Sequence, residues 1–358
     1  MSPDDLAQQL LAAVRAQQLG STPDRRLGGA PIGEFPSLDL AVVGFVPGRT
    51  PLWANVLFSR EHPQGFVAQP GLRGERPGNL RYVADITDAQ TVSVAWQPRA
   101  DWSRLSFPRL AGDDAAPRFV APYPASLLKV MVAVGVGLAM DAGLCRVEDI
   151  EAAARAMIVE SDNDTTSQLV KRLHEWGLIV RSAEGVETHN ALHALFESRG
   201  LHTLRLARTT PQGGWGNAAG SGVGHIQMTA WDTLRLLWLL DPQAPAAPWP
   251  GAAPLMSSNS RDHILRWMGE HSPNRILFRD EVGSGVHFFH KTGTTENYGS
   301  DAGIVRARPP GQRHYIVALL SNLGSRYGPP DAEFDVTPRL SGLGLAVDAI
   351  MRHALEPG

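Results

Sequence analysis

Lysine is scarce in this chain, and one of its lysines follows a serine at a spacing that suits catalysis. Of 33 lysines and arginines only three are lysines, at positions 129, 171 and 291. Ser126 and Lys129 stand three positions apart in PYPASLLKVMVAVG, at the start of a predicted helix. That spacing puts both side chains on one helical face, one turn apart. A neutral lysine can take the proton of a serine hydroxyl and an arginine cannot, so the pair predicts an activated nucleophile.

Two further short motifs follow downstream. The segment VESDNDTTSQ contains Ser161, Asp162 and Asn163, and the segment FFHKTGTTENYG contains Lys291, Thr292, Gly293 and Thr294. Taken alone, the first motif is typical of a helix N-cap and the second of a hairpin edge with a solvated lysine. Lys171 lies on a predicted mid-chain helix and is interpreted as an ordinary surface residue.

The order Ser-x-x-Lys, Ser-Asp-Asn, Lys-Thr-Gly resembles that of the serine β-lactamase and penicillin-binding protein superfamily, and of class A β-lactamases in particular. The resemblance extends from about residue 80 to the end of the chain. It implies that Ser126 is acylated with Lys129 as the base. It also implies that Ser161 passes a proton to the leaving nitrogen, aided by the charge of Lys291.

The same resemblance implies the residues that bind the substrate. Asn163 would hold a substrate amide, and Thr292 and Thr294, on either side of Gly293, would bind a carboxylate or the backbone of the acyl group. The backbone N–H groups of Ser126 and Thr294 would form an oxyanion hole, which stabilises the charge that develops during acyl transfer.

The chain departs from class A enzymes at the glutamate that activates the deacylating water, within Arg-x-x-Glu-Pro. The corresponding stretch here is RLARTTPQGGWGN, and aligning its Pro211 with the family's proline puts Thr210 at the glutamate position. The nearest upstream carboxylate, Glu197, is interpreted as a solvated helix residue, with a displaced base as the alternative. Ser161 follows Ser126 by only 35 positions, which is fewer than usual in class A enzymes and predicts a more open cleft.

We therefore expect a serine hydrolase that forms an acyl-enzyme at Ser126 on an ester, amide or β-lactam-like substrate, as a weak β-lactamase with esterase activity. The alternatives are a true β-lactamase with an unusual deacylating group, and a penicillin-binding sensor that is acylated once without turnover. The expected partner is a small-molecule acyl substrate. No cofactor or metal is expected, because His287 and His290 would face opposite sides of a strand.

Composition narrows the setting. The net charge of −3 argues against a nucleic-acid or acidic-membrane partner. Neither a secretory signal nor an apolar run long enough to span a membrane is visible, so we expect a cytoplasmic protein.

The elements that must position these residues are helices predicted over 126–143, 147–158, 165–177, 191–200, 228–240 and 343–355, and strands over 38–46, 79–86, 91–96, 286–294, 301–307 and 314–322. Strands at both ends with helices between them predict an α+β fold in which the two ends meet in one sheet. The resemblance specifies an antiparallel sheet flanked by helices, plus a helical lobe. Residues 79–358 are the expected hydrolase domain, and residues 1–78 an N-terminal extension and candidate accessory module.

Overall fold

The computed structural model describes residues 1–24, 27–88, 93–96, 101, 104–216, 226–271, 276–278, 285–308, 311, 313–324 and 337–355. At its centre is a six-stranded antiparallel sheet in the order β11-β12-β13-β1-β2-β3. Its strands are β1 (Ser37–Gly44), β2 (Leu52–Phe58), β3 (Phe66–Ala68), β11 (Val286–Thr294), β12 (Tyr298–Ala307) and β13 (His314–Asn322). The sheet thus joins segments from both ends of the chain, as the sequence predicts.

Smaller sheets lie around this one. One of them has three strands, β4 (Arg81–Ala84), β5 (Arg109–Ala111) and β6 (Arg118–Ala121). The other two are strand pairs: β7 (Ile179–Arg181) with β8 (Glu187–Asn190), and β9 (Arg205–Leu206) with β10 (Ile226–Gln227). In the described part of the predicted strand over 91–96, Ser93 forms only an isolated antiparallel bridge with Thr87, because the chain enters a 3₁₀ turn over Val94–Trp96.

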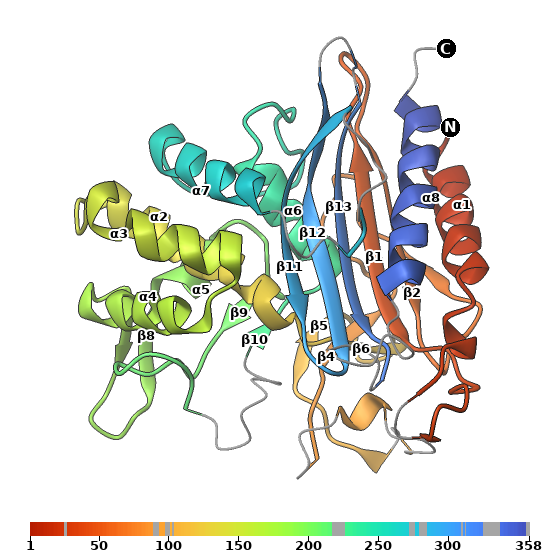
Figure 1. Ribbon diagram of the computed structural model, residues 1–358, viewed down its shortest axis with the longest axis horizontal. Coiled ribbons are helices and arrows are strands. Elements are labelled where there is room, and N and C mark those ends of the chain that lie inside the picture. Colours follow the sequence, from red (N-terminus) through yellow and green to blue (C-terminus); the bar gives the residue numbers. More distant parts are fainter. Residues whose placement is uncertain are drawn as a thin grey trace.

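Helices cover both faces of the main sheet (Figure 1). On one face lie α1 (Pro3–Ala16) and α8 (Thr337–Leu355), and α6 (Ala230–Leu240) packs on the other. Beyond α6 a helical lobe contains α2 (Lys129–Asp141), α3 (Val147–Arg155), α4 (Asn163–Glu175) and α5 (Ala191–Ser198). The helix α7 (Ser258–Glu270) packs both on α2 and on the sheet strand β11. The α+β class with a helical lobe is therefore confirmed. None of the helices in the described ranges is long and apolar enough to cross a membrane.

The sheet crosses the domain boundary that the sequence predicts after residue 78. Every residue of β1 is buried, and β1 pairs along its whole length with β13 near the other end of the chain, with Val42 opposite Val317. Because β1 presents apolar side chains to helices on both faces, it requires the rest of the fold to cover it. The strands β1, β2 and β3 are consequently part of the main sheet and not of a separate module.

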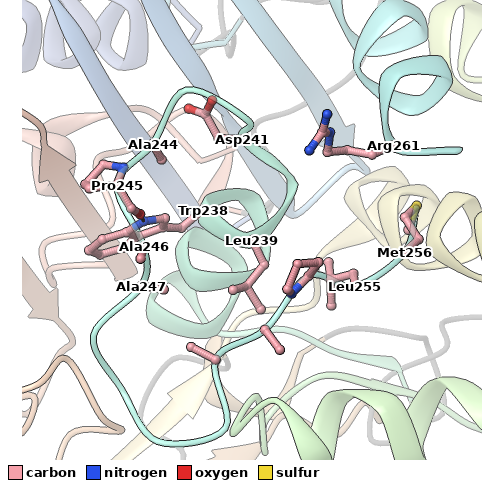
Figure 2. Close-up of a pocket in the computed structure, with 13 residues that line it drawn as sticks. Trp238, Leu239, Asp241, Ala244, Pro245, Ala246, Ala247, Leu255, Met256 and Arg261 are labelled. Atoms are coloured by element: carbon pink, nitrogen blue, oxygen red, sulfur yellow. Dashed lines mark hydrogen bonds between the residues drawn. The ribbon is translucent and has the colours of Figure 1, made fainter. Parts of the chain in front are cut away.

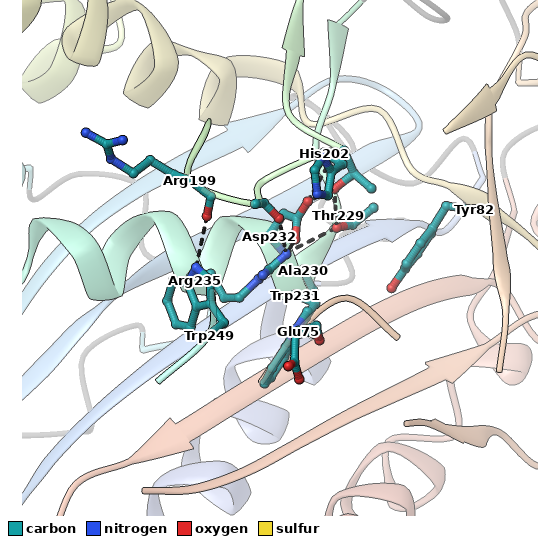
Figure 3. A network of polar contacts seen from close by, with 12 residues as sticks. Glu75, Tyr82, Arg199, His202, Thr229, Ala230, Trp231, Asp232, Arg235 and Trp249 are labelled. Carbon is teal, nitrogen blue, oxygen red and sulfur yellow. Dashed lines mark hydrogen bonds and ion pairs between the residues drawn. The ribbon is translucent and has the colours of Figure 1, made fainter. Parts of the chain in front are cut away.

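A buried polar network fastens the start of α6 to the lobe (Figure 3). Asp232 accepts hydrogen bonds from the backbone and hydroxyl of Thr203, at 2.8 and 2.7 Å, and pairs with Arg235. The Arg235 guanidinium donates in turn to Gly200 O at 2.8 Å and stacks over the Trp249 ring. Since each buried charge has a partner of opposite sign, the network avoids the large cost of an isolated buried ion.

Close packing of α8 gives a prediction about stability. A Cβ at Gly344 would lie 1.7 Å from the backbone oxygen of Leu277, whereas a Cβ at Gly342, two residues earlier, would meet only the flexible Gln17 side chain, at 2.8 Å. Gly344→Ala should therefore lower the free energy of unfolding by about 1–3 kcal/mol through overpacking. Gly342→Ala should change it by about 1 kcal/mol or less, with alanine's helix propensity in its favour. Urea unfolding measures both, and equal effects of the two variants would contradict this packing.

Candidate active site

Ser126 lies in a tight turn at the start of α2. Residues Ala125–Leu128 form a 3₁₀ turn that leads directly into α2, so the predicted helix over 126–143 begins with a tighter turn than expected. Ala125 has φ of +49°, a left-handed conformation that costs a residue with a side chain about 1–3 kcal/mol. Such strain persists where the surrounding packing imposes it, and here it sets the direction of the residue that carries the candidate nucleophile.

The strand β11 approaches this turn as closely as a backbone can. A Cβ at Gly293 would lie 2.2 Å from Pro124 O and 2.8 Å from Ser126 N, so only glycine fits at this position. The next residue, Thr294, is exposed at the end of the strand. The backbone of β11 therefore runs beside the Ser126 N–H group, which is the arrangement an oxyanion hole shared by Ser126 and Thr294 requires.

The amine of Lys129 lies among four oxygen atoms. Its Nζ is 2.5 Å from Ser161 O, 2.8 Å from Asn163 Oδ1, 3.1 Å from Ser126 Oγ and 3.2 Å from Ser161 Oγ. The backbone oxygen of Ser161 and the side-chain oxygen of Asn163 can only accept hydrogen bonds. A neutral amine has two N–H groups, which these two acceptors occupy, and one lone pair. That lone pair is then free to accept the proton of Ser126.

Burial makes this neutral form accessible. The Lys129 side chain is only 2% exposed, and loss of hydration lowers its pKa to about 8 although the nearby Asp162 charge opposes the shift. Lys291, fully buried, has its pKa lowered to about 7 by loss of hydration and, secondarily, by the charge of Lys129. Both amines therefore titrate within a few pH units of neutrality.

Ser161 lies between the two amines. The chain leaves α3 through one π-helical turn (Ala156–Glu160), and Ser161 then takes the left-handed conformation with φ of +60°. Lys291 Nζ donates to Ser161 Oγ at 3.0 Å and to Thr292 O at 2.9 Å. The Ser161 hydroxyl consequently contacts Lys129 on one side and Lys291 on the other, and can relay a proton between Lys129 and a leaving group.

The rest of the second motif confirms the N-cap prediction in part. Asp162 is the N-cap of α4 and accepts a hydrogen bond from Thr165 N at 2.7 Å. Asn163 is exposed, and its oxygen faces Lys129. Its amide nitrogen therefore remains available to a ligand, as a residue that holds a substrate amide would need.

Thr292 is placed differently from Thr294. Its side chain is 3% exposed, and its hydroxyl lies 3.0 Å from Nε2 of His271, a buried histidine directly after α7. Sequence reasoning missed His271, because it lies outside the three motifs and 20 positions before Lys291. Among the predicted residues, the structure brings together Ser126, Lys129, Ser161, Asn163, Lys291 and Gly293, and turns the hydroxyl of Thr292 toward His271.

The position aligned with the deacylating glutamate is engaged in its own turn. Thr210 Oγ1 donates to Gly213 O at 2.7 Å, and Gly213 N donates back to Thr210 O at 2.9 Å. The turn packs against α4, where a Cβ at Gly213 would lie 2.4 Å from Ser167 O. Glu197, the other candidate base, is half exposed and forms a 2.5 Å contact with His202 Nδ1. The Thr210 hydroxyl, which is bound within its own turn, cannot replace a carboxylate base.

A separate cavity of about 260 Å³ lies between the end of α6 and the start of α7 (Figure 2). Its lining is mostly apolar and shares no residue with the three motifs; the lining residues are Trp238, Leu239, Asp241, Ala244, Pro245, Ala246, Ala247, Ala252, Ala253, Pro254, Leu255, Met256 and Arg261. The buried Asp241 already pairs with Arg306 and His314. This cavity is therefore distinct from the cluster around Ser126.

Comparison with known proteins shows similarity to β-lactamases in sequence and in fold. The model of the beta-lactamase enzyme family matches residues 146–334, a range that includes Ser161 and Lys291. The fold resembles TLA-3 extended-spectrum β-lactamase (12% identity, TM-score 0.52, 99% of this chain and 100% of that one). It also resembles a variant of the class A β-lactamase of the last common ancestor of Gram-negative bacteria (17% identity, TM-score 0.54, 98% and 99%). A search of curated proteins found no match.

The two buried lysines give a prediction about the pH dependence of stability. In the folded protein the pKa is about 7 for Lys291 and about 8 for Lys129, below the ordinary 10.5. At a pH between the folded pKa and 10.5, the unfolded chain therefore binds more protons than the folded one. Stability must therefore rise with pH across this window, by at most about 1.4 kcal/mol per pH unit for each lysine. Lys291→Met should be more stable than the wild type at pH 7 and should show a smaller rise between pH 7 and 10.

Urea unfolding at several pH values measures this rise. Lys171→Met is the matched control, because the Lys171 side chain is 52% exposed on α4 and should leave the slope unchanged. An identical pH slope in wild type and Lys291→Met would show that Lys291 is not a buried amine with a lowered pKa.

Proposed function

Because this chain belongs to the beta-lactamase enzyme family, we propose that it is a serine hydrolase that forms an acyl-enzyme at Ser126 on ester, amide or β-lactam-like substrates. The observation that carries the proposal is the environment of Lys129. Its amine lies 3.1 Å from Ser126 Oγ, and its two N–H groups have separate acceptors, so its lone pair can receive the serine proton.

Acylation then proceeds in two balanced steps. Ser126 Oγ attacks the substrate carbonyl while its proton passes to Lys129 Nζ, and the carbonyl oxygen becomes an oxyanion beside the Ser126 and Thr294 N–H groups. On collapse, the bond from carbonyl carbon to the leaving nitrogen or oxygen breaks. The proton moves from Lys129 through the Ser161 hydroxyl to the leaving atom, and the positive charge of Lys291 favours this transfer.

We propose that deacylation uses the same groups. Thr210 is bound within its own turn, and a hydroxyl is a poor base for water. Once an alcohol has left an ester-derived acyl-enzyme, Lys129 with Ser161 can accept a proton from water on the path that the alcohol vacated. A β-lactam opens without separating, because its amine stays attached to the acyl group and occupies that path.

We therefore propose a weak β-lactamase with esterase activity. A true β-lactamase with another deacylating base would hydrolyse penicillins rapidly, and Glu197 would be the first residue to substitute. A penicillin-binding sensor would be acylated by esters and penicillins alike without turning either over. The engaged Thr210 and the intact pair of Ser126 and Lys129 favour the first of these three activities.

Lys129→Arg should abolish acylation, with a loss of more than a hundredfold in the rate of labelling by a fluorophosphonate. Arginine keeps the charge but stays protonated, so it cannot accept the serine proton. Intact-protein mass spectrometry gives the rate, and peptide mapping should place the adduct on Ser126. Lys171→Arg is the matched surface control and should label like the wild type. A loss of less than tenfold, about 1.4 kcal/mol of barrier, would exclude Lys129 as the base.

Penicillins and esters should behave differently at the same serine. After mixing with benzylpenicillin, the wild type should carry an adduct that persists for minutes or longer, because water cannot reach an activated base past the tethered amine. A small p-nitrophenyl ester should be turned over repeatedly, as followed by absorbance. Ser126→Ala is the control for both. Rapid penicillin hydrolysis without a trapped adduct would point to the true β-lactamase, and a single ester turnover to the sensor.

A further inference from the structure

A buried histidine outside the three motifs links two of them. His271 is fully buried after the end of α7 and directs one ring nitrogen to each motif. Its Nδ1 lies 2.9 Å from Val159 O, two residues before Ser161. Its Nε2 lies 3.0 Å from Thr292 Oγ1, one residue after Lys291. The imidazole thus bridges the turn that carries Ser161 and the strand that carries Lys291.

The acceptors around His271 fix where its proton lies. A backbone carbonyl only accepts hydrogen bonds, so Nδ1 must carry the hydrogen that points to Val159 O. Burial, with the nearby charge of Lys291 as a second cause, lowers the pKa of His271 to about 3, so the ring is neutral and Nε2 bears a lone pair. The backbone N–H of Thr292 also points at Nε2, at 3.4 Å, which agrees with an unprotonated nitrogen.

This assignment determines what Thr292 can do. If Nε2 is an acceptor, the Thr292 hydroxyl must donate its only proton to it. The side chain is also 3% exposed, in contrast to the exposed Thr294. A carboxylate needs a donor, and Thr292 has no proton left to give. The hydroxyl that can still face a substrate anion on this strand is that of Thr294.

His271 is itself held by a second buried pair. Its backbone oxygen accepts a hydrogen bond from His290 Nε2 at 2.9 Å, and His290 Nδ1 lies 2.8 Å from Asp301 Oδ1. The other oxygen of Asp301 accepts from Ile276 N and Leu277 N, both at 3.0 Å. Both nitrogens of His290 face oxygen atoms, one of the Asp301 carboxylate and one of the His271 backbone. This pair fastens the segment after α7 to β11 and β12.

We propose that His271 is a positioning residue that sets the distance between Ser161 and Lys291, and that Thr292 serves this bond instead of binding a substrate anion. The inference rests on the proposed function, because the distance matters through proton transfer by Ser161. A fixed bridge between the two segments keeps Lys291 Nζ at 3.0 Å from Ser161 Oγ without occupying either group. Thr294 then supplies the contact to any anionic group of the acyl substrate.

Four variants separate the two ring nitrogens and the hydroxyl. In His271→Asn the amide can still donate to Val159 O but does not reach Thr292. In His271→Gln the amide oxygen reaches Thr292 but the bond to Val159 is lost. Thr292→Val removes the hydroxyl at nearly constant shape, and Thr292→Ser retains it. His287→Asn is the control, because His287 is exposed on the same strand.

The readout is the acylation rate and the apparent dissociation constant for benzylpenicillin, which carries a carboxylate, and for a neutral p-nitrophenyl ester. Thr292→Val and His271→Asn should each lower the acylation rate about tenfold or more, by similar factors for both substrates, with dissociation constants changed less than threefold. Thr292→Ser should restore the rate. A selective loss of penicillin binding in Thr292→Val would overturn the proposal, and so would unchanged rates for both substrates.

A second measurement needs neither a variant nor a substrate. In the full chain labelled with ¹⁵N-histidine, His271 should give the nuclear magnetic resonance signature of a neutral ring with its proton on Nδ1, unchanged between pH 5 and 8. A ring protonated at Nε2 would overturn the assignment even if the variants fail to fold. Failure of the wild type to be acylated at Ser126 would instead overturn the proposed function, and the ring signature would still decide the bridge.

Discussion

The structure of this site depends on burying the amine of Lys129 beside the hydroxyl of Ser126. In the proposed mechanism Lys129 can act as a base only while it is shielded from water, and a buried ammonium is costly unless oxygen atoms surround it. The backbone oxygen of Ser161 and the amide oxygen of Asn163 meet that need at 2.5 and 2.8 Å, and both belong to a turn that is strained at Ser161. Strain at Ser161, whose backbone oxygen accepts from Lys129, is therefore part of the cost of one buried amine.

The fold offsets that cost with rigid surroundings. From Val130 to Gly137 every residue of α2 is buried, so this stretch of the helix packs on all sides and has little freedom to rotate. On the opposite side, β11 lies at the edge of a sheet whose inner strands come from both ends of the chain. Gly293 allows β11 to touch the turn at Ser126 directly. Helix and strand thus approach the amine from two elements that one hydrophobic cluster holds together, since it contains side chains of α2, β12 and β13.

Local chemistry made part of this predictable. The sequence alone shows three local patterns: a serine and a lysine one helical turn apart, an N-cap motif before a helix, and a lysine in an apolar strand. The structure brings the residues of these patterns together at Ser126, Lys129, Ser161 and Lys291. The contact of His271 with Thr292 has no such pattern, because it depends on where α7 ends relative to a strand that begins 16 residues later. In the described part of the strand expected over 91–96, pairing is limited to one bridge between Ser93 and Thr87, because the chain enters a 3₁₀ turn at Val94 in spite of its β-branched composition.

The division of labour within Lys-Thr-Gly-Thr shows why composition alone misassigns roles. Side chains two positions apart on a strand face the same side, so Thr292 and Thr294 share one face of β11. Thr292 lies deep enough to be covered by the segment after α7, whereas Thr294, at the exposed end of the same strand, is not. In our proposal the two threonines on one face therefore differ in function by depth: Thr292 maintains the spacing of the catalytic groups and Thr294 contacts the substrate. Substitutions at the outer position can alter substrate preference while the proton path between Lys129, Ser161 and Lys291 stays intact.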